Sequence, residues 1–584
     1  MRSHKLAALT LAFFTTALTT PAHAEWLEAK SKHFTVYGDM PEADLRQRTQ
    51  RLERFDAALR GLFKVTTDDN ATIYFVASLE EIRKLARMEN VAGFYRADAQ
   101  GAVGIVPERL PDYMRISPDR VLYHEYTHHM LLSNTTQFFP GWVTEGLAEL
   151  FMSAKFDEKG NVIIGEPNAN RSWAMGSLSR WSVRRLLDSD ANPPKIDDRI
   201  ELYSRGWLMC HYLLIGNKRP GQFFKFIDAI NAGMPPLQAG EQVFGNLEKL
   251  DQEIERYVRA NKFPSSLLSA EKLSATTDVS VRRFTPGETA IFKYRLVSAN
   301  GVDEKSAVTL ANTARRAATG FPDDTFVQRT MAEIEYDAKG YDAADVHASR
   351  ALAIDPKNIM AMVYKGRVAV QRAMISKNPA QWREARRWFL AANRLDPNYA
   401  LPFALYHDSF VAAGQEPPAD AIAGISRAVV LVPADSSLRV RAGIALIRAG
   451  DLKLARTVLA PVAFNPHEAG KNPYAKLVKE MDAGATREAL LTKAAELKID
   501  KVNEFIPPVA EGKPGDGKTD GGKDKKFRGH KTRSSGDTIL PSRPSSSGEG
   551  LGWGLYTGSN VAREDRPRPA AARRQNRQVS LPLP

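Results

Sequence analysis

The sequence of 584 residues has one cysteine, Cys210, and no long apolar run beyond its first 24 residues. A lone cysteine cannot form an internal disulfide, so the fold must be held by packing or by a bound metal. Cys210 stands in an apolar, helix-like stretch, where we expect a small buried side chain. Because a spanning helix needs roughly 20 apolar residues, the sequence predicts no transmembrane segment once the N-terminal run is removed.

The net charge is also small over most of the chain. The formal net charge is +13, but residues 511–584 alone hold 15 Lys/Arg against 8 Asp/Glu, and Arg2 and Lys5 add to the excess. The part between these segments is nearly neutral. A nucleic-acid-binding protein concentrates basic residues on its folded domain, so we expect no nucleic-acid partner.

The first 24 residues have the pattern of an export signal. Arg2 and Lys5 precede the apolar run Leu6–Leu18, which is followed by Ala22-His23-Ala24. A basic start, a short apolar run and a small-x-small site are typical of a cleaved signal peptide. The sequence therefore predicts a mature protein that begins at Glu25 and is periplasmic or secreted.

Residues 25–265 show mixed α/β patterning. Alternating apolar residues predict strands near 33–37, 71–76 and 102–106, and helices are predicted near 118–132 and 141–153. A polar turn at 157–161 between two apolar stretches predicts a hairpin. We expect residues 266–304 to be a linker.

Residues 305–500 show a repeat. Similar endings recur at Pro356, Pro397, Pro433 and Pro466, with spacings of 41, 36 and 33 residues. Tetratricopeptide units run about 34 residues, so the sequence predicts an all-α, tetratricopeptide-like array of paired helices.

The last part of the chain differs in composition. Residues 508–584 are rich in Gly, Ser, Pro, Lys and Arg, and we expect a disordered basic tail there.

A metal-binding pattern stands within the first predicted domain. Residues His124-Glu125-Tyr126-Thr127-His128 form an HExxH motif. Helical residues four apart lie on one face, so His124 and His128 can direct two imidazoles at one ion. Glu125 lies beside them, where it can act as a general base. Ser117 and Pro118 suit the start of such a helix.

A catalytic zinc takes three protein ligands and keeps an open position. Glu145 lies on the second predicted helix, 17 positions after His128. Here the chain resembles the gluzincin metallopeptidases, especially the peptidase MA-like group, whose second helix carries W-x-x-E-G-x-A. The matching residues are Trp142, Glu145, Gly146 and Ala148. The resemblance covers roughly residues 25–260, and its motifs are specific only between 121 and 151.

The resemblance implies an α+β thermolysin-like zincin domain that binds Zn²⁺ through His124, His128 and Glu145. Glu149, one turn after Glu145, is the alternative third ligand. If Glu145 is the ligand, Glu149 is expected to hold a ligand imidazole by its other nitrogen. Some gluzincins use a downstream tyrosine to stabilise the oxyanion, and Tyr203 is the residue here that fits this role.

Two other histidines, His129 and His211, lie near these motifs in the sequence or further along the same domain. His129 is adjacent to the ligand pair but points away from it, so we expect a core or surface residue. His211 is a weaker choice than Tyr203 for the oxyanion. A metzincin site would need Gly at 131 and His at 134, and the sequence has Leu131 and Asn134 there.

The predicted function is zinc-dependent hydrolysis of a peptide or protein substrate. Zinc lowers the pKa of its bound water to roughly 7, and Glu125 takes the proton. The resemblance also implies that residues 101–106 hold an extended substrate by pairing at a sheet edge. The alternative is an inactive peptidase fold that carries a tetratricopeptide-type scaffold for a protein partner. The sequence leaves the substrate and the choice between endopeptidase and exopeptidase open.

Overall fold

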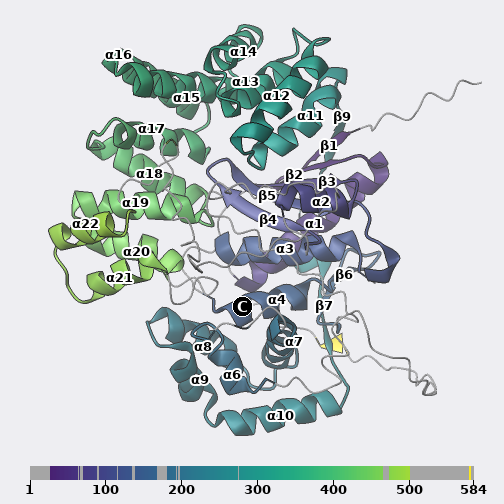
Figure 1. The fold of residues 1–584 in the computed structure, drawn as a ribbon. Coiled ribbons are helices and arrows are strands. Elements are labelled where there is room, and N and C mark those ends of the chain that lie inside the picture. Colours follow the sequence, from purple (N-terminus) through teal and green to yellow (C-terminus); the bar gives the residue numbers. More distant parts are fainter. Residues whose placement is uncertain are drawn as a thin grey trace, which may run out of the picture.

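The computed structural model describes residues 26–63, 65, 70–87, 91–114, 116–133, 139–167, 181–192, 194, 198–273, 275, 277–463, 472–499, 505 and 578–579. The predicted signal peptide (1–24), the repeat ending at Pro466 and nearly all of the predicted tail lie outside these residues. The described chain comprises a mixed sheet with its helices, a cluster of helices below it, and a long array of helix pairs (Figure 1).

A six-stranded sheet forms the centre of the first part. Its order is β4-β5-β3-β2-β1-β9, with β2, β3 and β5 parallel and the other neighbours antiparallel. The strands are β1 (Leu27–Lys30), β2 (Phe34–Gly38), β3 (Ala71–Val76), β4 (Phe94–Asp98), β5 (Gly101–Pro107) and β9 (Ser280–Arg283). The three predicted strands are present as β2, β3 and β5.

Alternation along the strands buries both faces of this sheet. One face, with Phe34 and Phe75, packs on α1 (Glu42–Phe63) and α3 (Pro118–Ser133). The opposite face, with Tyr74, packs on α2 (Leu79–Ala86) and α11 (Pro286–Ala299). Because apolar residues occupy both sets of alternate positions, neither face can be left to water.

The prediction of a linker at 266–304 is wrong for the second half of that range. Strand β9 pairs with β1, and the ring of Phe292 on α11 lies 4.6 Å from that of Trp26. Thr285 and Glu288 form a capping box at the start of α11, a sequence signal of a helix start that the linker prediction overlooked. The apolar outer face of the sheet requires this cover.

A second, small sheet has the order β10-β8-β7-β6. Its strands are β6 (Lys155–Phe156), β7 (Val162–Ile164), β8 (Ser265–Leu268) and β10 (Gln578–Val579). The predicted hairpin at 157–161 is confirmed as the β6–β7 turn. In contrast to the predicted disordered tail, its residues 578–579 form a short strand parallel to β8.

The cluster of helices below the six-stranded sheet comprises α4 (Gly141–Phe151), α6 (Val183–Leu187), α7 (Arg199–Cys210), α8 (Gln222–Asn231), α9 (Pro236–Phe244) and α10 (Leu247–Arg259). Helices α4 and α7 pack closely on each other. Cys210 at the end of α7 is fully buried, as predicted.

The remaining helices form antiparallel pairs in chain order, starting with α11 and α12. They are α12 (Glu304–Ala318), α13 (Thr325–Asp337), α14 (Tyr341–Ile354), α15 (Ile359–Ser376), α16 (Pro379–Leu395), α17 (Ala400–Ala412), α18 (Ala419–Leu431), α19 (Ser436–Ala449), α20 (Leu452–Ala463), α21 (Pro473–Asp482) and α22 (Arg487–Glu496). Short turns and side-chain caps such as Asp324, Asn358 and Asp435 separate them.

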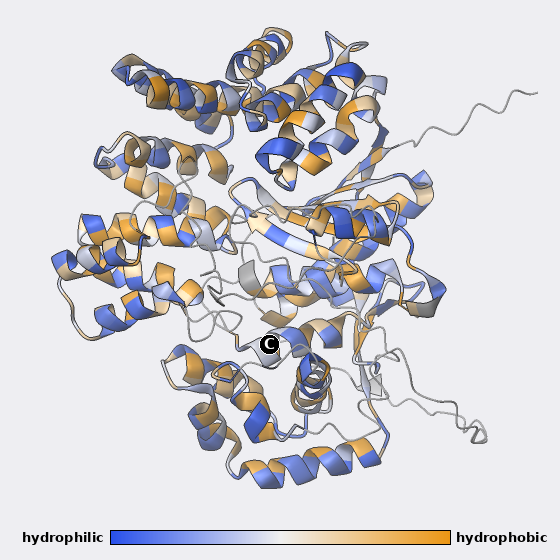
Figure 2. Cartoon of the chain, in the orientation of Figure 1, coloured by the Kyte–Doolittle hydropathy of each residue, from blue (hydrophilic) through white to orange (hydrophobic). Residues whose placement is uncertain are grey.

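These pairs form an arc over the top and left of the first part in Figure 1, and Figure 2 shows hydrophilic and hydrophobic residues mixed along every helix. The predicted paired-helix repeat is confirmed as an architecture. Ala99, in the β4–β5 turn, is buried in the core of the array, so the two parts touch at this hairpin. Within the described chain, no helix has both the length and the apolarity to cross a membrane.

Candidate metal centre

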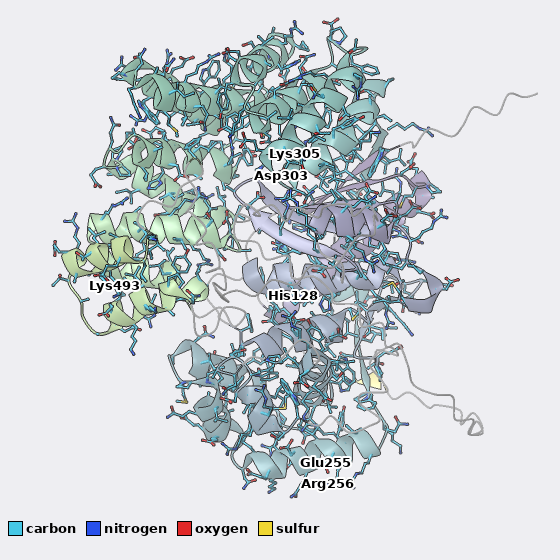
Figure 3. All side chains as sticks on the ribbon, viewed as in Figure 1. His128, Glu255, Arg256, Asp303, Lys305 and Lys493 are labelled. Carbon is cyan, nitrogen blue, oxygen red and sulfur yellow. The ribbon has the colours of Figure 1, made fainter. Side chains whose placement is uncertain are left out.

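The HExxH motif lies on α3, in the interior of the molecule. Residues 121–131 of this helix are buried on every side, including both histidines and Glu125. Figure 3 labels His128 near the middle of the fold, between the sheet and α4. Polar side chains are buried at such a position only when partners compensate their lost hydration.

Three side chains from two helices converge here. The Nε2 atoms of His124 and His128 are 3.1 Å apart, and each lies 3.7 Å from Oε2 of Glu145 on α4. The i, i+4 spacing brings the imidazoles together on α3, and the packing of α3 on α4 adds the carboxylate.

The triangle of donor atoms matches a zinc ion in size. A point equidistant from the three atoms lies about 2.0 Å from each, and zinc binds imidazole nitrogen and carboxylate oxygen at about 2.0–2.2 Å. All three residues are at most 4% exposed. The donor set and its size therefore fit a divalent transition metal.

Glu149 lies on the other side of His124. Its Oε1 is 3.9 Å from Nδ1 of His124, whereas Glu145 approaches the Nε2 atoms. The two glutamates thus face different nitrogens of one ring. Glu145 is therefore the carboxylate on the Nε2 side of the ring, and the orienting role of Glu149 stays a prediction.

Glu125 is fully buried beside the triangle. Burial raises its pKa well above the ordinary value, the nearby charge of Glu145 raises it further, and the main chain of Tyr95 on β4 opposes the shift. Neither carboxylate oxygen has a hydrogen bond of normal geometry within the described chain. Glu125 therefore lies beside the ligand triangle, where a general base would be needed, and that role stays a prediction.

Two contacts fix the position of α4. Gly146 meets Gly206 of α7 so closely that a Cβ atom built on Gly206 would lie 2.6 Å from the carbonyl oxygen of Trp142. At the start of the helix, the backbone N–H of Gly141 donates to Asp190 at 3.1 Å, and burial raises the pKa of that carboxyl to about 6. Glu145 lies between these two anchors.

A buried polar network fixes α3 from its opposite side. Tyr126, within the motif, donates to Asp56 of α1 at 2.5 Å, and Arg60 donates to the same carboxylate at 2.8 Å. His33 lies 2.8 Å from Glu53 and 3.3 Å from Asp56. These three acid–base groups also cluster tightly enough for a metal, but Arg60 and Tyr126 already donate to Asp56.

The structure also shows the surroundings of the other two histidines and the tyrosine named in the sequence. His129 is buried and its Nδ1 lies 2.7 Å from the hydroxyl of Tyr95, so it belongs to the core as expected. His211 contacts the carbonyl of Gly165 at 2.9 Å and Tyr257 at 3.0 Å, which assigns it a structural role. Tyr203 is half-buried on α7, and its oxyanion role stays a prediction.

The predicted substrate edge at residues 101–106 is wrong. Strand β5 is paired on both sides, by β3 and β4, so its main chain has no free edge. Strand β4, which pairs with β5, is one of the two edge strands of the described six-stranded sheet. The hairpin that covers β5 comes from the weakly patterned residues 94–98, which the sequence analysis did not identify as a strand.

Sequence comparisons do not assign a family. No family model matches the chain, and no curated protein matches it. Several solved structures match part of the chain. A thermophilic TPR protein of Thermus thermophilus is 14% identical over 34% of this chain and 99% of its own, with a TM-score of 0.28.

The Pseudomonas aeruginosa pilF protein is 16% identical over 37% of this chain and 93% of its own, with a TM-score of 0.28. A TPR protein described as having an unusual peptide-binding site is 22% identical over 32% and 94%, with a TM-score of 0.26. Likeness at such scores carries no argument, and the repeat array is assigned from its own helix pairs.

Proposed function

We propose that this chain is an exported zinc-dependent hydrolase of peptide bonds. His124, His128 and Glu145 would hold the metal, and Glu125 would serve as the general base. The observation that carries the proposal is the buried triangle of two imidazole nitrogens and one carboxylate oxygen, with sides of 3.1, 3.7 and 3.7 Å. The comparisons add no support for a peptidase, so the proposal rests on this geometry alone.

Each of the residues around the metal site would have a separate role in the reaction. A bound zinc would supply a Lewis acid that makes water a nucleophile near neutral pH. Glu125 would take the proton from the attacking water and deliver it to the leaving amine. Glu149 would hold the ring of His124 in place, and Tyr203 remains the proposed donor to the developing oxyanion.

We also propose that substrate adds to the edge of β4 as an extended strand. The main chain of Tyr95 lies beside Glu125, so this edge passes the proposed base. An extended peptide paired there would use main-chain hydrogen bonds for affinity and pockets for side-chain selection. Edge pairing does not depend on sequence, which suits a hydrolase of polypeptides.

Metal analysis of single variants tests the ligand set. The wild-type protein should bind one zinc per chain, while His124→Gln, His128→Gln and Glu145→Gln should lose it. His129→Gln is the matched control, because it is a buried histidine on the same helix that is bonded to Tyr95 instead. Equal zinc content in all five proteins would refute the proposed ligands.

Hydrolysis of an unstructured protein such as casein tests the base. Glu125→Gln should keep its zinc and lose activity by about 10²–10⁴-fold, the usual contribution of general base catalysis. Equal hydrolysis by wild type and Glu125→Gln would remove the mechanism.

A second candidate is a protein-binding scaffold without catalysis. Its support is the array of antiparallel helix pairs from α11 to α22, an architecture that builds extended binding surfaces. Protein that binds no zinc and hydrolyses no casein would favour the scaffold over the hydrolase.

A further inference from the structure

The array of helix pairs is packed against the hairpin that contains the sheet edge. Strands β4 and β5 are joined by a two-residue turn, because Asp98 pairs with Gly101. In that turn Ala99 is 4% exposed and lies in the hydrophobic core of the array, whereas Gln100 is exposed. Every other buried residue of that core in the described chain comes from residues 362–499. The end of the hairpin therefore packs into the array (Figure 1).

Two further contacts hold the array at this end of β4. Tyr399 directly precedes α17, and its pKa is raised mainly by burial and further by the charge of Asp98, so these two side chains lie near each other. Val432 and Ala434, in the connection between α18 and α19, pack against the main core of the first part. The array thus meets the first part at the hairpin and again at its own α18–α19 connection.

The other end of β4 lies beside the proposed base, since the main chain of Tyr95 is next to Glu125. Tyr95 and Ala99 are four residues apart, and a strand rises about 3.3 Å per residue, so roughly 13 Å of strand separates the base from the array. A peptide paired with β4 would extend past the base for only about four residues before it meets the array. Antiparallel pairing is the more stable arrangement, and it places the amino end of the peptide on this side.

We propose that the array closes the Ala99 end of the β4 edge, so that this chain releases short peptides of up to about four residues from the amino end of polypeptides. The inference rests on the proposed hydrolase function and names its substrate. An internal segment of a polypeptide would have to continue through the position that the array occupies. Each turnover adds one water across one peptide bond, giving a short peptide with a new carboxylate and a shortened polypeptide with a new amine.

Cleavage of end-blocked substrates by the full mature chain tests the proposal. An unstructured peptide with a fluorophore and a quencher is compared with the same peptide joined to folded lysozyme at its amino end or at its carboxyl end. Lysozyme at the amino end should slow cleavage by about 100-fold or more, because a displacement of about 1 Å at the reacting bond already has that effect. Lysozyme at the carboxyl end should leave the rate within about threefold of that of the free peptide. Mass spectrometry should find amino-terminal fragments of up to about four residues.

Substitution of Ala99 tests whether the array is the obstacle. Ala99→Glu places a charge in the apolar core of the array, which is unfavourable and should separate the hairpin from it. Cleavage of the amino-end fusion should then rise by about tenfold or more relative to the free peptide, since part of the misplacement is relieved. Gln100→Glu is the matched control, because it adds the same charge at the exposed residue of the same turn. It should show the substrate preference of wild type.

Three results would overturn the inference. They are equal cleavage of all three substrates by wild type, resistance of the carboxyl-end fusion in place of the amino-end fusion, and a folded Ala99→Glu with the wild-type preference. Circular dichroism and zinc content show whether Ala99→Glu is folded, and if it is not, the comparison of the three substrates with wild type decides alone. Absence of zinc-dependent cleavage of the free peptide would remove the proposed function itself, whereas equal cleavage of all three substrates would remove only this inference.

Discussion

Replacing Gly206 by alanine tests whether the α4–α7 crossing positions the third metal ligand. The new Cβ would lie 2.6 Å from the carbonyl oxygen of Trp142, whereas ordinary contact begins at 3.4 Å. Helix α4 would have to move by about 0.8 Å to relieve the contact. Glu145 is one turn along α4 from Trp142 and would move with it.

The expected effect has two parts. Overpacking of a dense core costs about 1–3 kcal/mol, so the free energy of unfolding should fall by that amount. Metal–ligand distances vary by only about 0.2 Å around their preferred values. Loss of a group that holds a ligand in place lowers metal affinity by about 10- to 100-fold. The zinc affinity of Gly206→Ala should therefore fall by at least about tenfold.

Competition with a chromophoric chelator measures the zinc affinity, and urea unfolding of the metal-free protein measures the stability. Gly320→Ala is the control, because a Cβ there meets nothing within 4 Å and the residue needs no positive φ. Gly206→Ala with reduced stability but unchanged zinc affinity would refute the idea that this crossing places Glu145.

Three further predictions concern single groups. Glu149→Gln should retain zinc but bind it about 10- to 100-fold more weakly, whereas Glu145→Gln should not retain it, as chelator competition can show. The hydrogen bond to Glu53 raises the pKa of His33, so its stabilisation is complete below about pH 6.5 and is lost as the pH rises through the folded pKa. Urea unfolding should therefore give a larger loss for His33→Gln at pH 5.5 than at pH 8.5, and an equal loss would contradict this. Burial raises the pKa of Cys210, so a thiol reagent should react with it only after denaturation.

Local patterns were sufficient to predict three strands of the sheet, the paired helices of the array and one half of the metal centre. The spacing of His124 and His128 places two imidazoles on one face of any helix, whatever the rest of the fold does. Alternating apolar residues predicted β2, β3 and β5, and recurrent helix endings predicted the paired helices of the array. These signals are local because hydrogen bonding and side-chain periodicity repeat over a few residues.

Contacts between distant residues decided what these patterns left open. Glu145 and Glu149 share a face of α4, and only the packing of α4 on α3 turns Glu145 toward both Nε2 atoms and leaves Glu149 to Nδ1. Likewise, β4 rather than β5 is the sheet edge because strand order depends on pairings that composition does not encode. The packing of α11 on the outer face of the sheet likewise depends on contacts between residues far apart in the chain.

The sequence alone thus determined which groups are available for chemistry, since residue type and helical spacing are local properties. The tertiary structure decided which atoms of those groups meet, because that depends on how helices far apart in the chain pack. The difference is physical: a helix sets directions relative to its own axis, and only a second element sets the distance between two axes.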